Sequence, residues 1–261
     1  MVIERSRQVN VKPFPSNRRL VTAAARAGRR MVPMHGLLEM DITDANRLLA
    51  SHHPPLSLTA FVVASVARAA SAHPAVHAYR NWRGNLVTHS HVDVTTLVEI
   101  STSQGSFGLP PVIRDADVRD VEDVTAELRR VKQDPSTSSS GRVLERAAPI
   151  ATRIPGALWT MYAVMARSTA VRQRTGTVAV SAVGMFAGGG GFGLAPLTLM
   201  SLQVVVGGVS QQPRAISGHT AVRDVLDLTV SVDHNVVDGA PATRFGAALR
   251  ELMENARVLR P

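Results

Sequence analysis

The 261-residue sequence contains no cysteine, and it also lacks long apolar runs. Without cysteine the chain can form no disulfide, no thiolate metal site and no cysteine nucleophile. No run reaches the roughly 18 apolar residues that a membrane-spanning helix needs, and residues 1–30 are rich in arginine and lack the apolar core of a secretion signal. We therefore expect a cytoplasmic protein that does not associate with a membrane.

Aromatic residues make up only 4% of the chain, whereas hydrophobic residues reach 45%. That hydrophobic fraction is ordinary for a globular protein, so the core must be built from alanine, valine, leucine and isoleucine. A chain of this length forms one large domain or two small ones.

Positive charge is unevenly distributed. The net charge is +9, and residues 1–30 contain eight arginines or lysines against one acid, Glu4. Such a segment can bind an anionic partner, or it can be a solvated helix and tail whose arginines pair with carboxylates elsewhere. Because the segment lacks the interleaved aromatic residues on which bases stack, we expect no binding to nucleic acid.

Hydrophobic periodicity predicts helices that alternate with strands. The helices are predicted over residues 18–30, 43–50, 57–71, 121–132, 154–166 and in the C-terminal segment, and the strands over 37–42, 92–100, 178–183, 204–209 and 226–233. This order indicates an α/β chain with a mixed sheet. Residues 134–141 predict a surface loop, and 154–166 predict a helix packed on this protein or a neighbouring subunit.

The segment around His234 is the leading candidate for chemistry. Apolar and polar residues alternate over 226–233, and an Asp-Gly turn at Asp238 precedes residues at helical spacing. The pattern places His234 at the end of a strand, where a rigid element fixes the ring. Imidazole is suited to moving protons near neutral pH. A strand-end histidine near an aspartate is equally typical of a structural role, and the pattern alone leaves both readings open.

Four segments, in order along the chain, resemble the acyltransferase catalytic domain of 2-oxo acid dehydrogenase complexes. They are Leu109–Asp117 (Leu-Pro-Pro-Val-Ile-Arg-Asp-Ala-Asp), Thr177–Phe186 (Thr-Val-Ala-Val-Ser-Ala-Val-Gly-Met-Phe), Gln203–Val209 and Asp233–Ala240 (Asp-His-Asn-Val-Val-Asp-Gly-Ala). The last is similar to the family's His-x-x-x-Asp-Gly signature. Weaker likeness extends from about residue 18 to the C-terminus. We therefore divide the chain into a basic N-terminal arm, 1–17, and an acyltransferase catalytic domain, 18–261.

The resemblance implies a chloramphenicol acetyltransferase-like α/β (α+β) fold, a mixed β-sheet flanked by helices that assembles as a trimer. It also implies transfer of an acyl group, acetyl above all, between coenzyme A and a thiol or hydroxyl acceptor. The acceptor is dihydrolipoamide on a separate protein or a small molecule. Coenzyme A or acyl-CoA is then the substrate, and the sequence does not identify the residues that bind it.

Three residues match the family's catalytic positions. His234 matches the general base, and Ser181 matches the serine that stabilises the oxyanion, which comes from the neighbouring subunit in homologues. Asp238 matches the aspartate that orients the turn. From the residues alone, without the family resemblance, Ser181 is an ordinary polar residue in a strand, and Asp238 is a residue that its Asp-Gly turn favours.

Three departures from the family pattern bear on the acceptor and on activity. Asn235 replaces an arginine, Ala182 replaces an asparagine or serine, and a glycine-rich run over 187–193 replaces a more structured loop. We interpret the run as a reshaped substrate channel. The departures also favour an alternative, a catalytically inactive trimeric scaffold or binding module.

No metal site and no covalent lipoyl group are expected on this chain. His89 and His91 lack a third ligand nearby in sequence, and five further histidines, His52, His53, His73, His77 and His219, are interpreted as surface or turn residues. The only lysines, Lys12 and Lys132, do not lie in the exposed hairpin that a lipoyl-bearing lysine needs. The expected partners are copies of the chain in a homotrimer or larger assembly and a separate lipoyl-bearing protein.

Overall fold

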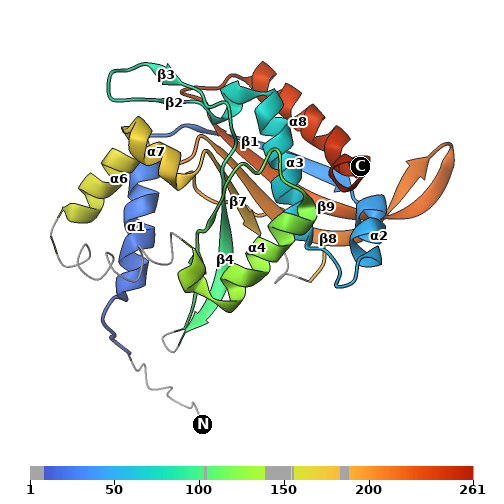
Figure 1. Cartoon of the computed structure of the whole chain (residues 1–261), viewed down its shortest axis with the longest axis horizontal. Helices are drawn as coiled ribbons and strands as arrows, with labels where there is room; N and C mark the ends of the chain where they lie inside the picture. Colours follow the sequence, from blue (N-terminus) through green and yellow to red (C-terminus); the bar gives the residue numbers. More distant parts are fainter. Residues whose placement is uncertain (1–8, 103–104, 139–153, 155, 183–187, 261) are drawn as a thin grey trace, which may run out of the picture.

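A computed structural model describes residues 9–102, 105–138, 154, 156–182 and 188–260 (Figure 1). Its helices are α1 (Ser16–Gly28), α2 (Thr43–Ser51), α3 (Leu58–Ala72), α4 (Val121–Gln133), α6 (Ala157–Arg167), α7 (Thr169–Thr175) and α8 (Gly239–Glu254), with short 3-10 turns at Pro74–His77, Pro135–Thr137 and Arg257–Leu259. Its strands are β1 (Pro33–Asp41), β2 (Tyr79–Arg80), β3 (Leu86–Val87), β4 (Val94–Thr102), β5 (Gly105–Leu109), β6 (Val112–Ile113), β7 (Val178–Ala182), β8 (Leu202–Ile216) and β9 (His219–Asp233).

The main sheet is mixed, in the order β1-β9-β8-β7-β4-β5, with β6 paired to β4. The pairs β4–β7 and β7–β8 are parallel, and the other pairs are antiparallel. Strand β7 therefore lies in the centre, where short apolar strands are covered on both faces. A separate two-stranded hairpin is formed by β2 and β3.

One face of the sheet is covered by α2, α3, α4 and α8, and the main core fills the space between them (Figure 1). Helix α3 lies at its centre because its residues are apolar or small on almost every side, and ten of its fifteen are buried. Its N-terminus is capped by Ser57, whose hydroxyl accepts a hydrogen bond from the Ala60 N–H.

Helices α1, α6 and α7 form a second group at the other end of the molecule, beside the β2–β3 hairpin (Figure 1). The Tyr162 hydroxyl of α6 donates to the Leu20 carbonyl of α1 over 3.3 Å. Arg167 lies 5.6 Å from the ring centroid of Trp82 in the hairpin turn, and Arg172 of α7 lies 4.8 Å from that of Tyr79. These contacts join three segments that are distant in sequence.

Strands β8 and β9 form a long hairpin that extends past the rest of the sheet (Figure 1). Its turn, Ser217-Gly218, has positive φ at both residues, as a two-residue type I′ turn requires. A β-bulge interrupts the ladder between Val206 and Val209, where Gly207 and Gly208 face the single residue Asp227.

The predicted α/β class and mixed sheet flanked by helices are confirmed, with boundaries mostly within three residues of the expected ones. The main extensions are β8 and β9, which run about seven residues further than predicted. The loop prediction at 134–141 lies partly outside the described residues. In the described part of the chain, no helix has the length and apolar character needed to cross a membrane. The division at residue 17 stays a prediction.

Candidate functional site

His234 lies immediately after the end of β9, as the sequence predicts. Its backbone N–H donates to the Val32 carbonyl over 2.7 Å, and the preceding Asp233 N–H donates to the Ser201 carbonyl over 2.9 Å. The backbone is thus held from both sides, while the side chain is 48% exposed. A fixed backbone with an open ring is the arrangement that a proton-transfer residue needs.

The Asp233 carboxylate organises the turn that carries His234. Its Oδ1 accepts from the Val32 N–H (3.0 Å), from the Asn235 N–H (3.1 Å) and from the Asn235 side-chain amide (2.8 Å). That amide also donates to the Arg30 carbonyl over 3.1 Å. Asn235, where the family has arginine, therefore ties the His234 turn to the segment that follows α1.

Asp238 is the N-cap residue of α8, but its side chain makes no capping hydrogen bond. Its Oδ1 lies 3.8 Å from His234 Nδ1, which is an ion-pair separation longer than a hydrogen bond. With 88% of its side chain exposed, Asp238 is open to solvent or to a partner. The structure places the predicted pair together at a strand-to-helix turn.

Ser181 lies in the central strand β7, and its side chain is only 6% exposed. Residues 178, 180 and 182 of this strand face the main core, so Ser181 faces the opposite side of the sheet, as Ala179 does. Its direct neighbours in the ladders are Leu97 of β4 and Val205 of β8. Leu97 is 45% exposed, which marks where this face of the sheet opens to solvent.

The structure does not bring Ser181 and His234 together within one chain. Ser181 of β7 pairs with Val205 of β8, and Val205 in turn pairs with Thr229 of β9. His234 lies five residues further along β9, roughly 17 Å along the strand and roughly 10 Å across two strand spacings. The two residues are therefore about 19 Å apart by this geometry, too far for one substrate atom to contact both.

The glycine-rich run packs against the bulge in β8. The Gly191 N–H donates to Asp227 Oδ2 over 2.6 Å, and the Gly208 N–H donates to the Gly191 carbonyl over 3.0 Å. A Cβ on Gly208 would lie 1.8 Å from the Gly189 carbonyl oxygen, and Gly189 itself has a φ of 112°. The glycines of the run, Gly189 and Gly191, and those of the bulge, Gly207 and Gly208, thus permit a close backbone approach that no other residue allows. Residues 183–187, which include the start of the run, lie outside the described residues.

Arg172 is a buried residue near the site that the sequence did not single out. It is 1% exposed, its guanidinium donates to the Leu199 carbonyl and contacts Met200 Sδ, and burial lowers its pKa to about 10. Because Ser201 in the same segment accepts from Asp233, Arg172 supports the chain that flanks the His234 turn. One arginine within a polar helix gives no sequence signal for such a role.

The sequence predicts His77 to be a surface or turn residue, and it does lie in a turn, but it is not on the surface. His77 is fully buried in the 3-10 turn before β2, and burial, followed by the nearby His89, His91 and Arg172, lowers its pKa to about 4. The sequence misled because a Pro-Ala-Val-His segment has the composition of an exposed turn. The His89 and His91 rings are 5.3 Å apart, and no metal-binding group of three His, Asp or Glu residues occurs among the described residues.

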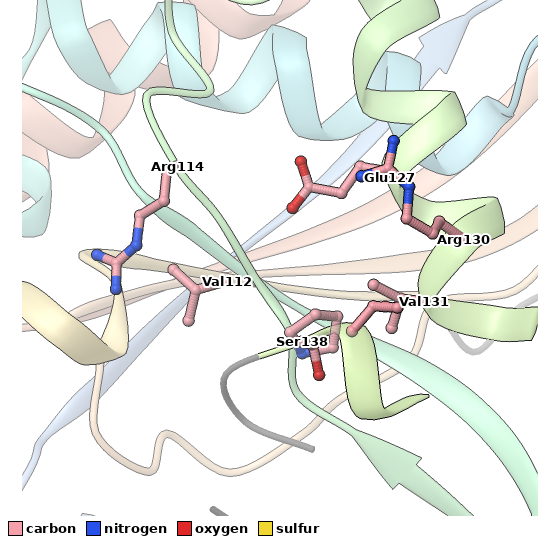
Figure 2. A pocket seen from close by; sticks show the side chains of 8 residues that line it. Val112, Arg114, Glu127, Arg130, Val131 and Ser138 are labelled. Atoms are coloured by element: carbon pink, nitrogen blue, oxygen red, sulfur yellow. The ribbon is translucent and has the colours of Figure 1, made fainter. Parts of the chain in front are cut away.

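A hollow of about 210 Å³ lies between β6, α4 and the 3-10 turn that follows α4 (Figure 2). Its lining includes Arg114, Glu127 and Arg130, and none of the predicted site residues. Arg114 is already bound to Asp93 and to the Gln173 and Arg174 carbonyls, and Glu127 pairs with Arg119. The hollow is separate from the His234 turn.

Comparison with known proteins supports the resemblance read from the sequence. Residues 163–260 match the family model of the 2-oxoacid dehydrogenases acyltransferase catalytic domain. A lipoamide acyltransferase component of a branched-chain alpha-keto acid dehydrogenase complex from Pseudomonas aeruginosa is 24% identical over 258 residues, covering 95% of this chain and 52% of that protein. The chain thus spans about half the length of this curated relative.

Two solved structures show the same fold. A dihydrolipoamide acetyltransferase from Azotobacter vinelandii superposes with a TM-score of 0.70 at 18% identity, covering 99% of this chain and 98% of that one. A chloramphenicol acetyltransferase gives a TM-score of 0.50 at 13% identity, covering 94% and 98%. The predicted resemblance and the predicted fold are confirmed.

Proposed function

We propose that this chain is an acyltransferase that moves an acyl group, acetyl above all, between coenzyme A and a thiol or hydroxyl acceptor. The observation that carries the proposal is the His234 turn, where an exposed imidazole is held on a fixed backbone beside a carboxylate. The family match includes this turn. Coenzyme A is therefore a substrate here, and dihydrolipoamide on a separate protein or a small molecule is the acceptor.

The spacing of the site residues supports the assignment. In the Azotobacter enzyme the catalytic roles of a serine, a histidine and an asparagine have been investigated. There the serine precedes the histidine by 52 positions and the asparagine follows it by four. Here Ser181 precedes His234 by 53 positions and Asp238 follows it by four. The three residues thus have nearly the same spacing in both chains, with an aspartate here where that enzyme has an asparagine, and this spacing supports the same roles.

In the proposed mechanism His234 acts as general base through Nε2, because Nδ1 is the nitrogen beside Asp238. It removes the proton from the acceptor thiol or hydroxyl, which attacks the thioester carbonyl of acyl-CoA. The Ser181 hydroxyl donates a hydrogen bond to the resulting oxyanion. The intermediate then collapses, the C–S bond to coenzyme A breaks, and the imidazolium returns its proton to the departing thiolate.

This mechanism requires a second copy of the chain, because His234 and Ser181 are about 19 Å apart in one copy. A ring in which each copy places its His234 near the next copy's Ser181 solves the problem with one repeated heterologous contact. A trimer is the smallest ring that the family resemblance implies. The exposed His234 and the opening beside Leu97 are the surfaces that such a contact would cover.

An inactive trimeric scaffold of the same fold is the second candidate. It is favoured by the weak pairing of Asp238, which is 88% exposed and 3.8 Å from the imidazole. It is also favoured by Asn235, which makes structural hydrogen bonds where the family has a charged arginine. A scaffold of this kind would bind partners without turning over acyl-CoA.

The test is acceptor-dependent release of coenzyme A from acetyl-CoA by the purified protein. The absence of cysteine gives the protein no thiol background of its own. Hydroxyl acceptors are followed by free thiol, and dihydrolipoamide is followed by formation of its thioester. We expect His234→Ala to abolish transfer and the matched control His219→Ala, at the exposed first residue of β9 next to the hairpin turn, to retain it. Equal activity of the two variants would refute the mechanism, and inactivity of the wild-type assembly with every acceptor would favour the scaffold.

A further inference from the structure

A buried polar cluster lies where α7 meets the β2–β3 hairpin (Figure 1). Its guanidinium, from Arg172, lies 4.8 Å from the ring centroid of Tyr79. The Tyr79 ring in turn stacks on His89, with the two ring centroids 5.7 Å apart. His77, in the 3-10 turn before β2, is close enough for the charges of His89 and Arg172 to lower its pKa. Side chains from distant parts of the sequence thus meet in one place.

The cluster contains more polar atoms than it has hydrogen-bond partners for them. Five buried atoms are without a partner, namely His77 Nδ1 and Nε2, the Tyr79 hydroxyl, His89 Nε2 and Arg172 Nε. His77 is fully buried, Arg172 is 1% exposed and Tyr79 is 4% exposed. Buried polar groups in folded proteins are almost always hydrogen-bonded. So many unpartnered atoms together indicate a place that is built to hold another group.

The cluster is also positively charged without a counter-ion. Among the described residues, no ion pair includes Arg172, although this side chain is almost inaccessible to solvent. The nearby carboxylates are bound to other groups, because Asp93 pairs with Arg114 and Asp117 accepts from the Ser71 hydroxyl. A buried charge without a counter-ion is unfavourable. An anion would therefore stabilise the cluster.

An anion suits these atoms better than a metal ion or water does. Arg172 Nε can only donate, the Tyr79 hydroxyl can donate, and even a neutral His77 ring has one N–H. A metal ion would be repelled by the guanidinium, and no group of three His, Asp or Glu ligands occurs in the described part of the chain. Water could accept these hydrogen bonds, but it would leave the charge uncompensated.

The enclosure of the cluster limits the size of the anion. Arg172 and His77 are out of contact with solvent, so a large organic anion has no room to reach them. His89 is half-buried, and the ring of His91, 5.3 Å from it, is 35% exposed. These two rings therefore mark the side from which a small ion can enter.

We propose that Arg172, His77, Tyr79 and His89 form a binding site for a small monovalent anion, for which chloride is the probe. The guanidinium, imidazole and phenol groups donate to the anion, and the anion neutralises the buried charge of Arg172. The site supports the segment beside the His234 turn, because Arg172 also donates to the Leu199 carbonyl and the Ser201 carbonyl accepts from the Asp233 N–H. The inference does not depend on the proposed acyl transfer.

Thermal unfolding tests the site in solution, in sodium chloride and in sodium gluconate at equal ionic strength and protein concentration. Chloride should raise the melting temperature saturably, by about 3 °C at ten times its dissociation constant, because it binds only the folded chain. Arg172→Met should lose this shift. The matched control Arg223→Met, which loses the ion pair with Asp41, should keep it. No shift in the wild type, or equal shifts in all three proteins, would overturn the proposal.

Acid stability gives a second readout in solution. His77 faces His89, His91, Arg172 and Asp117, and burial followed by the first three of these groups lowers its pKa to about 4. A bound anion favours the charged imidazole and so raises this pKa towards 6.5. Chloride should therefore reduce the loss of stability between pH 6.5 and pH 4 that is measured in gluconate. An equal loss in the two salts would contradict the site.

Crystals of the wild-type protein grown in sodium bromide give a test that needs no variant, in case Arg172→Met does not fold. Bromide can replace chloride and is located by its anomalous scattering. We expect a bromide ion in hydrogen-bond contact with Arg172 Nε and a His77 ring nitrogen. Bromide found only on the surface, with water in the cluster, would overturn the proposal. None of the three measurements uses acyl transfer, so each outcome is separate from the fate of the proposed function.

Discussion

Complementation between two inactive variants is the sharpest consequence of the distance between Ser181 and His234. We expect His234→Ala alone to be inactive, and Ser181→Ala alone to lose about 10²–10³ in turnover, the usual effect of removing one oxyanion donor. Each variant still carries the residue that the other lacks. Because no single chain brings both residues to one substrate, a site made between copies can recover both from different chains.

The size of the recovery follows from the geometry of a ring. When the two variants are co-expressed in equal amounts, a site is complete only if the chain that supplies histidine is the Ser181→Ala variant and its neighbour is the His234→Ala variant. Random assembly gives this arrangement in about one quarter of the sites, so activity should return to about 25% of wild type. The assay is coenzyme A release by the co-purified assembly, normalised to protein.

A second mixture separates shared sites from sites within one chain. Wild type co-expressed with the double variant Ser181→Ala/His234→Ala should give about one quarter of full activity if sites are shared, and about one half if each chain acts alone. No recovery in the first mixture, together with one half in the second, would refute the intersubunit site. Differently tagged chains confirm that mixed assemblies form.

Three further predictions concern stability. Arg172→Met should lower the free energy of unfolding, measured in urea, by about 2 kcal/mol, because a buried carbonyl loses its hydrogen-bond donor. Arg172→Lys should restore only part of this loss, since lysine lacks the planar guanidinium group. The pKa of His77 is about 4 in the folded chain and 6.5 in the unfolded chain, so the unfolded chain takes up the proton first as the pH falls. The free energy of unfolding therefore has its full His77 contribution above pH 6.5 and should fall by about 3 kcal/mol towards pH 4. His77→Phe should remove that part of the pH dependence, and an unchanged slope would contradict the assignment. Gly208→Ala should lower the melting temperature by several degrees, since its Cβ would meet the Gly189 carbonyl at 1.8 Å, whereas Gly36→Ala, whose nearest atom is at 4.0 Å, should not.

Much of the fold can be predicted from local pattern, because burial on one face imposes a period on the sequence. The strand before His234 is an example, since alternation over 226–233 fixed both its type and its end. The outer half of the β8–β9 hairpin carries no such pattern, because residues 211–220 are mostly exposed on both sides. Its pairing is held by backbone hydrogen bonds and a turn, which leave little trace in hydrophobicity.

The site was only partly predictable for a different reason. His234 and Asp238 are close in sequence, so a motif can place them together. The glycine run and Gly207-Gly208 contact each other through backbone atoms, and nothing in the sequence of either segment predicts that the other packs against it. The interpretation of the run as a reshaped channel therefore stays a prediction, whereas its packing role is visible in the structure. The buried position of Arg172 likewise depends on residues 27 positions away along the chain.

The long hairpin of β8 and β9 offers a convenient point for attaching other molecules. Its turn at Ser217-Gly218 and His234 flank the two ends of the fifteen-residue strand β9, so they are separated by roughly 50 Å. A fluorophore or a fused domain at the turn would sit far from the candidate chemistry, yet on an element rigidly joined to it. If the chain assembles as proposed, each assembly would display several such attachments at fixed spacing, which makes this protein a candidate platform for multivalent display.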